Sequence, residues 1–299
     1  MALRHIPVLV EELLALLQPR CGGVYVDGTI GAGGMALSLL QKAGPEGRLI
    51  GIDQDPEALT IARETLASCA GQVTWVEGNF ENISEILKEN RLSGVDGIYA
   101  DLGLSSMQLA EGNRGFSFQQ EGPLDMRMSL SSLKTAWEIL SQSSEESLAD
   151  ILFQYGEERL SRKIARRIKE ALHEKKLKTT LDLANLVFYC YPPQKRHGRI
   201  HPATRTFQAL RIAVNRELEA LKKFLAEAPF CLKPRGVLAL ISYHSLEDRL
   251  VKNAFRHFSK EGFSLLTKKP IVASREEQNQ NPRSRSGKLR GLKKEDLKS

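Results

Sequence analysis

Four short apolar runs that alternate with helical patterns constrain the fold of this chain more than any other feature of its sequence. The runs are Val24–Asp27, Arg48–Asp53, Val73–Glu77 and Val95–Asp101. Strands that alternate with helices in this way are typical of a parallel sheet with crossover helices. The sequence therefore predicts a doubly wound, Rossmann-like α/β domain.

The alternation stops after Asp101. The segment 102–127 is rich in glycine, serine and isolated charges, and 135–188 has helical periodicity with no candidate strand. A mainly helical insertion of about 100 residues, the size of a small domain, therefore interrupts the α/β domain. The α/β pattern then resumes with a helix over 206–226, a strand over 237–243, a helix over 246–258 and a candidate strand over 263–272.

A length of 299 residues with 41% hydrophobic content allows one large or two modest globular domains. No apolar stretch reaches the ~20 residues that a bilayer requires, and the N-terminus has no signal-peptide pattern. The four cysteines lie far apart with no C-x-x-C pair, so we expect no metal site, no disulfide framework and a reducing, cytoplasmic location. We expect four segments: a first α/β core segment at 1–106, the helical insertion at 107–204, a second core segment at 205–280 and a basic tail at 281–299.

Charge is distributed unevenly along the chain. Residues 1–158 hold 10 Lys and Arg against 23 Asp and Glu, whereas residues 159–299 hold 33 against 13. The basic excess is concentrated at Arg159–Lys178, Gln194–Arg211 and Asn281–Ser299. Such separation suggests that one part of the chain binds a polyanion such as nucleic acid. Solvated helix faces and a basic tail are the alternative.

A glycine-rich segment, Asp27-Gly28-Thr29-Ile30-Gly31-Ala32-Gly33-Gly34, joins the first strand to its helix. Glycines there let the backbone approach a ligand, and a helix N-terminus offers free N–H groups to an anion. Asp53 follows 22 positions after Gly31 at the tip of the next strand, where a carboxylate can bind both ribose hydroxyls. The pair is compatible with NAD, FAD or S-adenosylmethionine (AdoMet). A tight structural turn is the alternative.

Other residues favour AdoMet over a dinucleotide. The glycine pattern is G-x-G-G rather than G-x-G-x-x-G, so the dinucleotide fingerprint is imperfect. Asp27 stands just before the glycines, where it can meet the ammonium group of an amino acid. Phe80 follows the third strand, beside an adenine pocket or in the core, and Asp101 ends the fourth strand at the carboxyl edge of the sheet. Together these residues look like an AdoMet-dependent methyltransferase site.

Six longer motifs identify a family. They resemble the MraW/RsmH family of bacterial methyltransferases, which act on the N4 amine of a cytosine in small-subunit (16S) ribosomal RNA. The resemblance extends from His5 to Arg290, nearly the whole chain. The motifs are DLGLSSMQL at 101–109, RGFSF at 114–118, GPLDMRM at 122–128, YGEER at 155–159, HPATRTFQALR at 201–211 and SYHSLEDR at 242–249.

The resemblance implies a class I, Rossmann-like AdoMet-dependent methyltransferase core with a helical insertion that recognises the substrate. That substrate would be a cytidine in the decoding (P-site) region of 16S rRNA in the small ribosomal subunit, and a homodimer is compatible with the family. Met35 departs from the histidine common in the family, which is harmless if its contact is made through the backbone. The implied AdoMet contacts are Gly33, Gly34, Met35, Asp53, Phe80, Asp101 and Gln108.

The exocyclic amine of cytosine is a poor nucleophile because its lone pair is delocalised into the ring. A group that accepts an amine N–H bond would localise the lone pair and help the proton to leave. We expect Asp101 either to be this acceptor or to bind the amino-acid part of AdoMet. The reacting base would leave its stack for a pocket. Tyr243, Phe116 and Phe118 are candidates for its aromatic wall, and the protein core is their alternative location.

The remaining candidate substrate contacts are polar. His244 either touches the substrate or caps the helix that begins at Leu246, and Ser245 with Asp248 has the pattern of a capping box. Three arginines are candidates for contacts with RNA phosphates or for internal salt bridges: Arg114, Arg205 and Arg211.

Two other functions share parts of this pattern. An NAD-dependent oxidoreductase would use the glycine segment and Asp53, but the sequence offers no evident hydride-transfer site. A non-catalytic RNA-binding assembly factor could be built on a methyltransferase fold, although the intact Asp27 and Asp101 argue against it. Binding assays with NAD and AdoMet separate the first alternative, and labelled methyl transfer to RNA separates the second.

Overall fold

The structure, a computed structural model, describes residues 7–103, 114–129, 134–198 and 200–296. The chain forms two compact units. The α/β unit combines Met1–Gly103 with Leu218–Ser299, and the helical unit is Leu104–Glu217. Among the described residues, every helix is too short or too polar to cross a bilayer.

A seven-stranded sheet forms the α/β unit, with the strand order β3-β2-β1-β4-β5-β7-β6. All neighbouring strands from β3 to β5 pair in parallel, and β7 runs antiparallel to both β5 and β6. The first four predicted strands are confirmed at the expected bounds. The strands are β1 (Val24–Asp27), β2 (Arg48–Asp53), β3 (Val73–Glu77), β4 (Val95–Asp101), β5 (Leu232–Ser242), β6 (Phe263–Leu265) and β7 (Lys288–Lys294).

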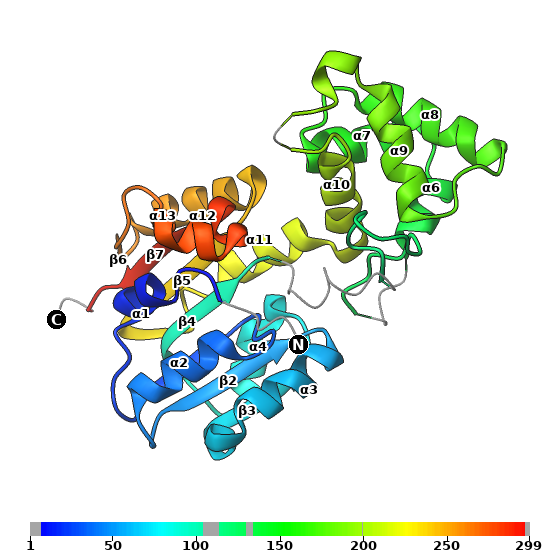
Figure 1. Cartoon of the computed structure of the whole chain (residues 1–299). Coiled ribbons are helices and arrows are strands. Elements are labelled where there is room, and N and C mark those ends of the chain that lie inside the picture. The colour runs from blue at the N-terminus through cyan, green and yellow to red at the C-terminus, as the bar shows by residue number, and fades with distance from the viewer. Residues whose placement is uncertain (1–6, 104–113, 130–133, 199, 297–299) are drawn as a thin grey trace. The chain divides into compact units, whose positions relative to one another are not determined.

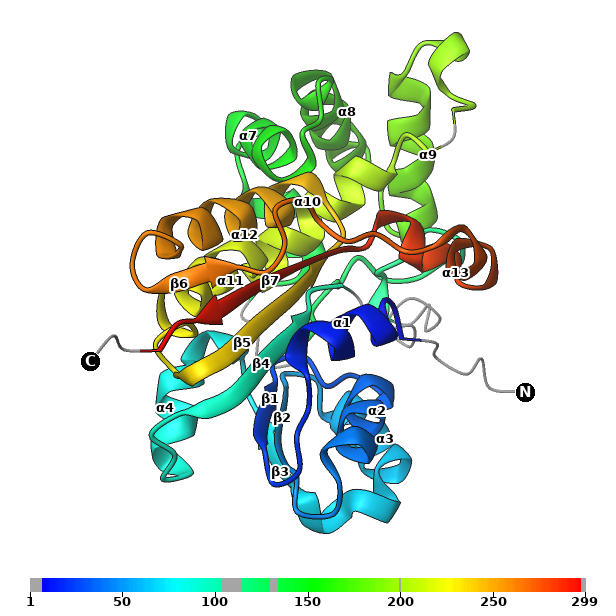
Figure 2. The same ribbon diagram turned by 90° about the vertical axis from the view of Figure 1, so that its left-hand side faces the viewer.

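Helices cover both faces of this sheet (Figure 2). Because successive strand residues point to opposite faces, Tyr99 of β4 joins one apolar cluster while Ile98 and Ala100 join the other. The first face carries α1 (Val10–Leu17), α2 (Gly34–Ala43) and α3 (Pro56–Thr65). The second carries α4 (Ile83–Glu89), α11 (Glu217–Glu227) and α12 (Ser245–Phe258). The predicted Rossmann-like α/β fold is therefore confirmed.

The order of the strands reverses direction between β1 and β4, since β2 and β3 lie on one side of β1 and β4 and β5 lie on the other. In open parallel sheets, ligands bind outside the carboxyl ends of the strands at such a reversal. Asp27, Asp53 and Asp101 are the last residues of β1, β2 and β4. The sheet therefore brings these three carboxylates to one edge.

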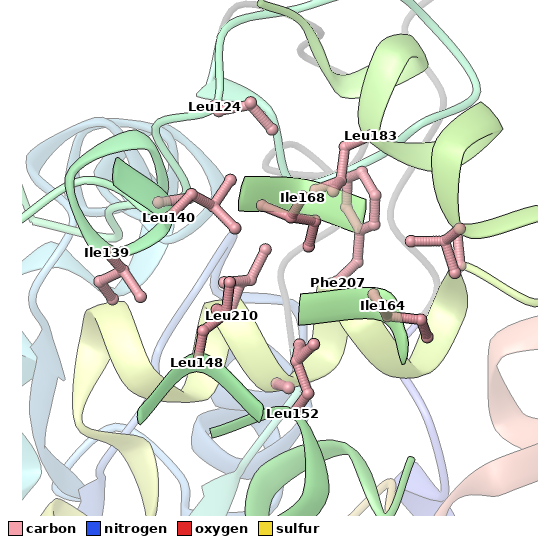
Figure 3. Close-up of a cluster of buried hydrophobic side chains, with 14 of the residues drawn as sticks. Leu124, Ile139, Leu140, Leu148, Leu152, Ile164, Ile168, Leu183, Phe207 and Leu210 are labelled. Atoms are coloured by element: carbon pink, nitrogen blue, oxygen red, sulfur yellow. The ribbon is translucent and has the colours of Figure 1, made fainter. Parts of the chain in front are cut away.

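The helical unit has its own apolar core (Figure 3). Leu148, Ile164, Ile168, Leu183 and Leu210 are buried there and come from four different helices. The predicted helical character of 135–188 is confirmed. The helices are α6 (Ala136–Gln142), α7 (Glu145–Gly156), α8 (Ser161–His173), α9 (Thr180–Cys190) and α10 (Thr204–Asn215), with a short 3₁₀ helix at Pro193–Lys195.

The single helix predicted over 206–226 is wrong. Arg216 adopts a left-handed conformation (φ 51°) that ends α10, and α11 begins at the next residue. Phe207 and Leu210 of α10 are buried in the core of the helical unit. The second core segment, expected to begin at 205, therefore begins at Leu218, because α10 buries its apolar face among the other helices.

The segment 281–299, expected as a basic tail, is folded as far as the structure describes it. A 3₁₀ helix at Pro282–Ser286 precedes β7, which lies between β5 and β6 in the sheet (Figure 2). Arg290 of β7 is buried, and its Nε donates to Oδ1 of Asp248 on α12 at 2.7 Å. The strand predicted over 263–272 is shorter, ending at Leu265, and α13 (Arg275–Gln280) follows it.

The ion pair between Arg290 and Asp248 should stabilise the fold. Removing one partner of a buried pair costs 3–5 kcal/mol, and we expect Arg290→Ala to lower the free energy of unfolding by about 3 kcal/mol because Lys288 still faces Asp248. Lys288→Ala is the matched control, since its longer, more exposed contact with the same carboxylate should contribute below ~1 kcal/mol. Urea unfolding measures both. If neither substitution changed the free energy of unfolding, the segment 281–299 would behave as a tail that does not stabilise the fold.

Candidate active site

Three buried or half-buried carboxylates meet at the carboxyl edge of the sheet. Burial, together with the negative charges of Asp53 and Asp101, raises the pKa of Asp27 to about 7. Burial also raises the pKa of Asp53 and that of Asp101 to about 6. Like charges held close together in an apolar setting disfavour ionisation. A cationic group bound at this edge would therefore stabilise the ionised carboxylates.

Backbone hydrogen bonds fix the glycine segment between β2 and β4. The N–H of Gly31 donates to Oδ2 of Asp53 (2.9 Å), and the N–H of Thr29 donates to Oδ1 of Asp27 (3.0 Å). The hydroxyl of Thr29 accepts the N–H of Asp101 (2.8 Å). Thr29 therefore ties the Asp27 carboxylate to the backbone of Asp101, a role that has no signal in the sequence because hydroxyls are common in turns.

The glycines of this segment have a structural role in addition to any contact with a ligand. Gly31 and Gly33 have positive φ angles of 51° and 81°, which other residues rarely adopt. A Cβ on Gly33 would lie 3.3 Å from Cα of Ala62, and one on Gly34 would lie 2.8 Å from Cγ of Pro7. The structural-turn interpretation thus explains part of the motif, because α2 packs this closely against its neighbours.

The N-terminus of α2 has no side-chain cap. Its first-turn N–H groups therefore have no helical partner and are available to an anion. The side chain of Met35 is buried in the apolar cluster beneath α2, so at this position only the backbone N–H can face a ligand. A backbone contact of this kind would tolerate methionine in place of histidine.

Phe80 and Gln108, two of the residues expected to contact AdoMet, have different outcomes. Phe80 begins a 3₁₀ helix (Phe80–Asn82), and its half-buried ring packs edge-to-face on Phe224 with centroids 4.9 Å apart. This contact supports the core interpretation of Phe80 and leaves its contact with a ligand as a prediction. Gln108 lies outside the described residues.

Asp101 and Tyr243 form a coupled pair. The Tyr243 ring lies so close to Gly103 that a Cβ there would be 2.7 Å from ring atom Cε2. Burial raises the pKa of Asp101 to about 6, and the hydrogen bond from the Tyr243 hydroxyl and the positive charge of Arg283 keep it from rising further. Burial and the negative charge of Asp101 raise the pKa of Tyr243, so its hydroxyl stays a donor.

One oxygen of this pair lacks a partner. Oδ1 of Asp101 is buried and accepts no hydrogen bond within the described part of the chain. A buried acceptor without a partner costs free energy, and a ligand N–H group could satisfy it. Arg283 was assigned to an RNA-binding tail from its sequence position. Its electrostatic effect on Asp101, 182 positions away in the chain, depends on tertiary structure alone.

His244 caps α12, which was one of its two predicted roles. Its Nδ1 accepts the N–H of Glu247, and the Glu247 carboxylate accepts the N–H of His244 in return. Oε2 of Glu247 also accepts the N–H of Tyr243 at 2.9 Å. The capping box predicted for Ser245 with Asp248 is wrong, because the helix begins one residue earlier and Asp248 pairs with Arg290.

The other substrate candidates lie in the helical unit. Phe116 is buried in its core, and Phe118 packs against that core. Nη2 of Arg114 donates to the carbonyls of Arg127 (2.8 Å) and Met128 (2.6 Å). Arg211 forms a two-bonded ion pair with Glu217, both at 2.8 Å, as the internal salt-bridge alternative stated. Arg205 has an exposed side chain that also donates to the Glu157 carbonyl (3.2 Å).

The raised pKa of Asp27 predicts a pH dependence of stability. The folded protein holds this proton more tightly than the unfolded chain, whose Asp pKa is ~3.9, so the contribution to stability is lost as pH rises towards about 7. Asp27→Asn keeps an oxygen for the Thr29 N–H and removes this titration. Between pH 5 and pH 8, the free energy of unfolding of wild type should fall by at least ~1.4 kcal/mol more than that of the variant, as measured by urea unfolding. Parallel pH profiles for the two proteins would contradict the shift.

The chain matches the family model of the MraW methylase family over residues 2–295. It is also similar to proteins named ribosomal RNA small subunit methyltransferase H. The one from Sorangium cellulosum is 50% identical over 97% of this chain and 91% of the relative. Those from Synechocystis sp. and Heliobacterium mobile are 50% and 46% identical, covering 97% and 98% of this chain and 93% and 100% of the relatives. The chain therefore belongs to the MraW methylase family.

Proposed function

We propose that this protein transfers a methyl group from AdoMet to ribosomal RNA of the small subunit, and that the acceptor is the N4 amine of a cytidine in the decoding (P-site) region of 16S rRNA. The relatives that align over nearly the whole chain carry the name of a small-subunit rRNA methyltransferase. Membership of a methylase family favours this reaction over hydride transfer from a dinucleotide. The cytidine and the atom rest on the resemblance of the six motifs to the family.

The carboxylate edge fits AdoMet, which when bound supplies a methyl group on a positively charged sulfonium. Asp27 would accept from the ligand's ammonium group, and Asp53 from its ribose hydroxyls. The uncapped N-terminus of α2 would bind its carboxylate through backbone N–H groups. Each acid has a pKa raised by burial, and a cationic ligand relieves that cost. The observation that carries the proposal is this cluster of three acids beside a free helix N-terminus.

Asp101 would act on the amine of the substrate. Its buried Oδ1 has no described partner and can accept an N–H bond from the amine, which localises the nitrogen lone pair and prepares the proton to leave. The Tyr243 hydroxyl and the charge of Arg283 favour the ionised form of Asp101 that this role needs. The alternative role of Asp101, binding the amino-acid part of AdoMet, uses the same ionised oxygen.

The test of the proposal is to incubate the protein and labelled AdoMet with small ribosomal subunits from a strain that lacks the enzyme, and with their extracted rRNA. We expect label on one cytidine of 16S rRNA, as N4-methylcytidine in a nucleoside digest. Label on a ring carbon or a ribose would overturn the assignment of the atom. AdoMet binding with no transfer to either substrate would favour a non-catalytic assembly factor.

Asp101→Asn tests the chemistry. A neutral amide accepts the amine proton poorly, so we expect the single-turnover rate at saturating AdoMet to fall roughly 10²-fold, the lower range for a lost general base. Tyr243→Phe, which keeps the ring over Gly103 and removes only the hydroxyl, should have a smaller effect. A normal rate in folded Asp101→Asn, with weaker binding of S-adenosylhomocysteine, would limit Asp101 to cofactor binding.

A further inference from the structure

A cluster of rings and one cation lies at the end of α9 in the helical unit. Tyr189, in the last turn of this helix, exposes 67% of its surface. The guanidinium of Arg196 lies 5.1 Å from the centre of the Tyr189 ring and 5.5 Å from that of Phe188. Nε of Arg196 donates to the Tyr191 carbonyl at 2.9 Å. This hydrogen bond holds the cation against the rings.

Phe188 connects the cluster. Its ring meets Tyr189 edge-to-face at 5.4 Å, lies within 5.6 Å of His197 and is stacked on His201 at 5.7 Å. We call these four rings and Arg196 the Tyr189 platform. A large exposed ring that is held in place by its neighbours can bind a flat ligand at little cost in side-chain entropy.

Basic side chains lie close to the platform, on the neighbouring helix α8. Arg162, Lys163, Arg166 and Arg167 are all exposed, and their three- and four-residue spacing puts them on one helix face. We call these four residues the α8 bases.

A groove of about 410 Å³ joins the two features, since its lining residues include Lys163, Arg167 and Tyr189. Glu170 and Glu174 also line it, and they form ion pairs with Arg167 and Lys176 at 2.7 Å. Asp182, the third acid of the groove, accepts the backbone N–H groups of Lys178 and Thr179 at 2.9 Å.

Of the α8 bases, Arg167 is paired with Glu170 and Arg166 with Glu145 (3.5 Å). Lys163 lines the groove, and its Nζ donates to the Cys190 carbonyl. Exposed ion pairs of this kind contribute little free energy, so phosphates can compete for these bases.

We infer that the Tyr189 platform and the α8 bases bind a single-stranded segment of the substrate RNA, with one unstacked base on the Tyr189 ring. The inference rests on the proposed function, because it describes how the same enzyme holds its RNA. An exposed aromatic ring stacks on any free base, whereas the base faces of a duplex are already covered. The α8 bases, two of which line the groove, would neutralise the phosphates of that segment.

The test measures binding of a fluorescein-labelled single-stranded RNA dodecamer to the full chain by anisotropy. We expect Tyr189→Ala to weaken binding roughly 5- to 100-fold, the loss for one stacked base, and Tyr189→Trp to preserve it. The slope of log affinity against log salt should stay unchanged in Tyr189→Ala, because no phosphate contact is lost. In Arg162→Gln/Arg166→Gln it should flatten by about 0.7 per lost contact.

Phe153→Ala is the matched control. Phe153 is 60% exposed on α7 of the same unit and makes no ring contact within the described residues, so its loss should leave RNA affinity unchanged. Wild-type affinity in folded Tyr189→Ala, equal losses in both variants, or tighter binding of the corresponding duplex would each overturn the inference.

Methyl transfer by wild type separates the two proposals. If the wild-type enzyme transfers methyl groups and Tyr189→Ala binds RNA normally, only the RNA-binding surface is refuted. If RNA binding depends on Tyr189 but no methyl transfer occurs, the surface is supported and the proposed activity is refuted.

Discussion

The structure depends on one electrostatic constraint, the meeting of three carboxylates at the edge where the strand order reverses. Parallel pairing of β2, β1 and β4 brings the carboxyl ends of all three strands to the same edge of the sheet. Each strand ends in an aspartate, and β2 and β4 extend two residues beyond Asp27 of β1. Burial raises the pKa of every one of them. A fold that served stability alone would not collect these groups, since ionised carboxylates in an apolar setting oppose folding. A cluster of carboxylates with raised pKa values at the edge of a sheet is a candidate site for a cationic ligand.

Backbone geometry keeps this edge rigid without a ligand. Gly31 and Thr29 donate N–H bonds to Asp53 and Asp27, and the Thr29 hydroxyl accepts from the backbone of Asp101. On the far side of Asp101, Tyr243 is positioned by Gly103 beneath its ring and by Glu247 at its N–H. Hydrogen bonds that are already made before binding reduce the entropy lost when the ligand arrives. The site is therefore preorganised.

The two units divide the chemistry by charge. The α/β unit holds the buried acids, and its basic strand β7 is neutralised in part by Asp248. The helical unit has an independent apolar core, which frees the outer faces of α8 and α9 for bases and an exposed ring. Two of the arginines that were candidates for RNA contacts or internal salt bridges have partners within this unit, Arg211 in an ion pair and Arg114 at backbone carbonyls. The position of an arginine in a basic segment did not by itself distinguish a contact with RNA from a contact within the protein.

The sequence by itself determined the parallel strands, the acids at their ends and the helical insertion, because buried strands, glycine turns and helix periods are local patterns. It also placed His244 at the start of a helix. Only the tertiary structure decided that 288–294 is a strand. Its lysines and Arg290 mask the apolar pattern of Leu289 and Leu292 in the sequence, and Asp248, the acid that pairs with Arg290, lies 42 residues away in the chain. The same holds for α10, which joins the helical unit through long-range packing of Phe207, and for Arg283, whose effect on Asp101 has no local sequence signal.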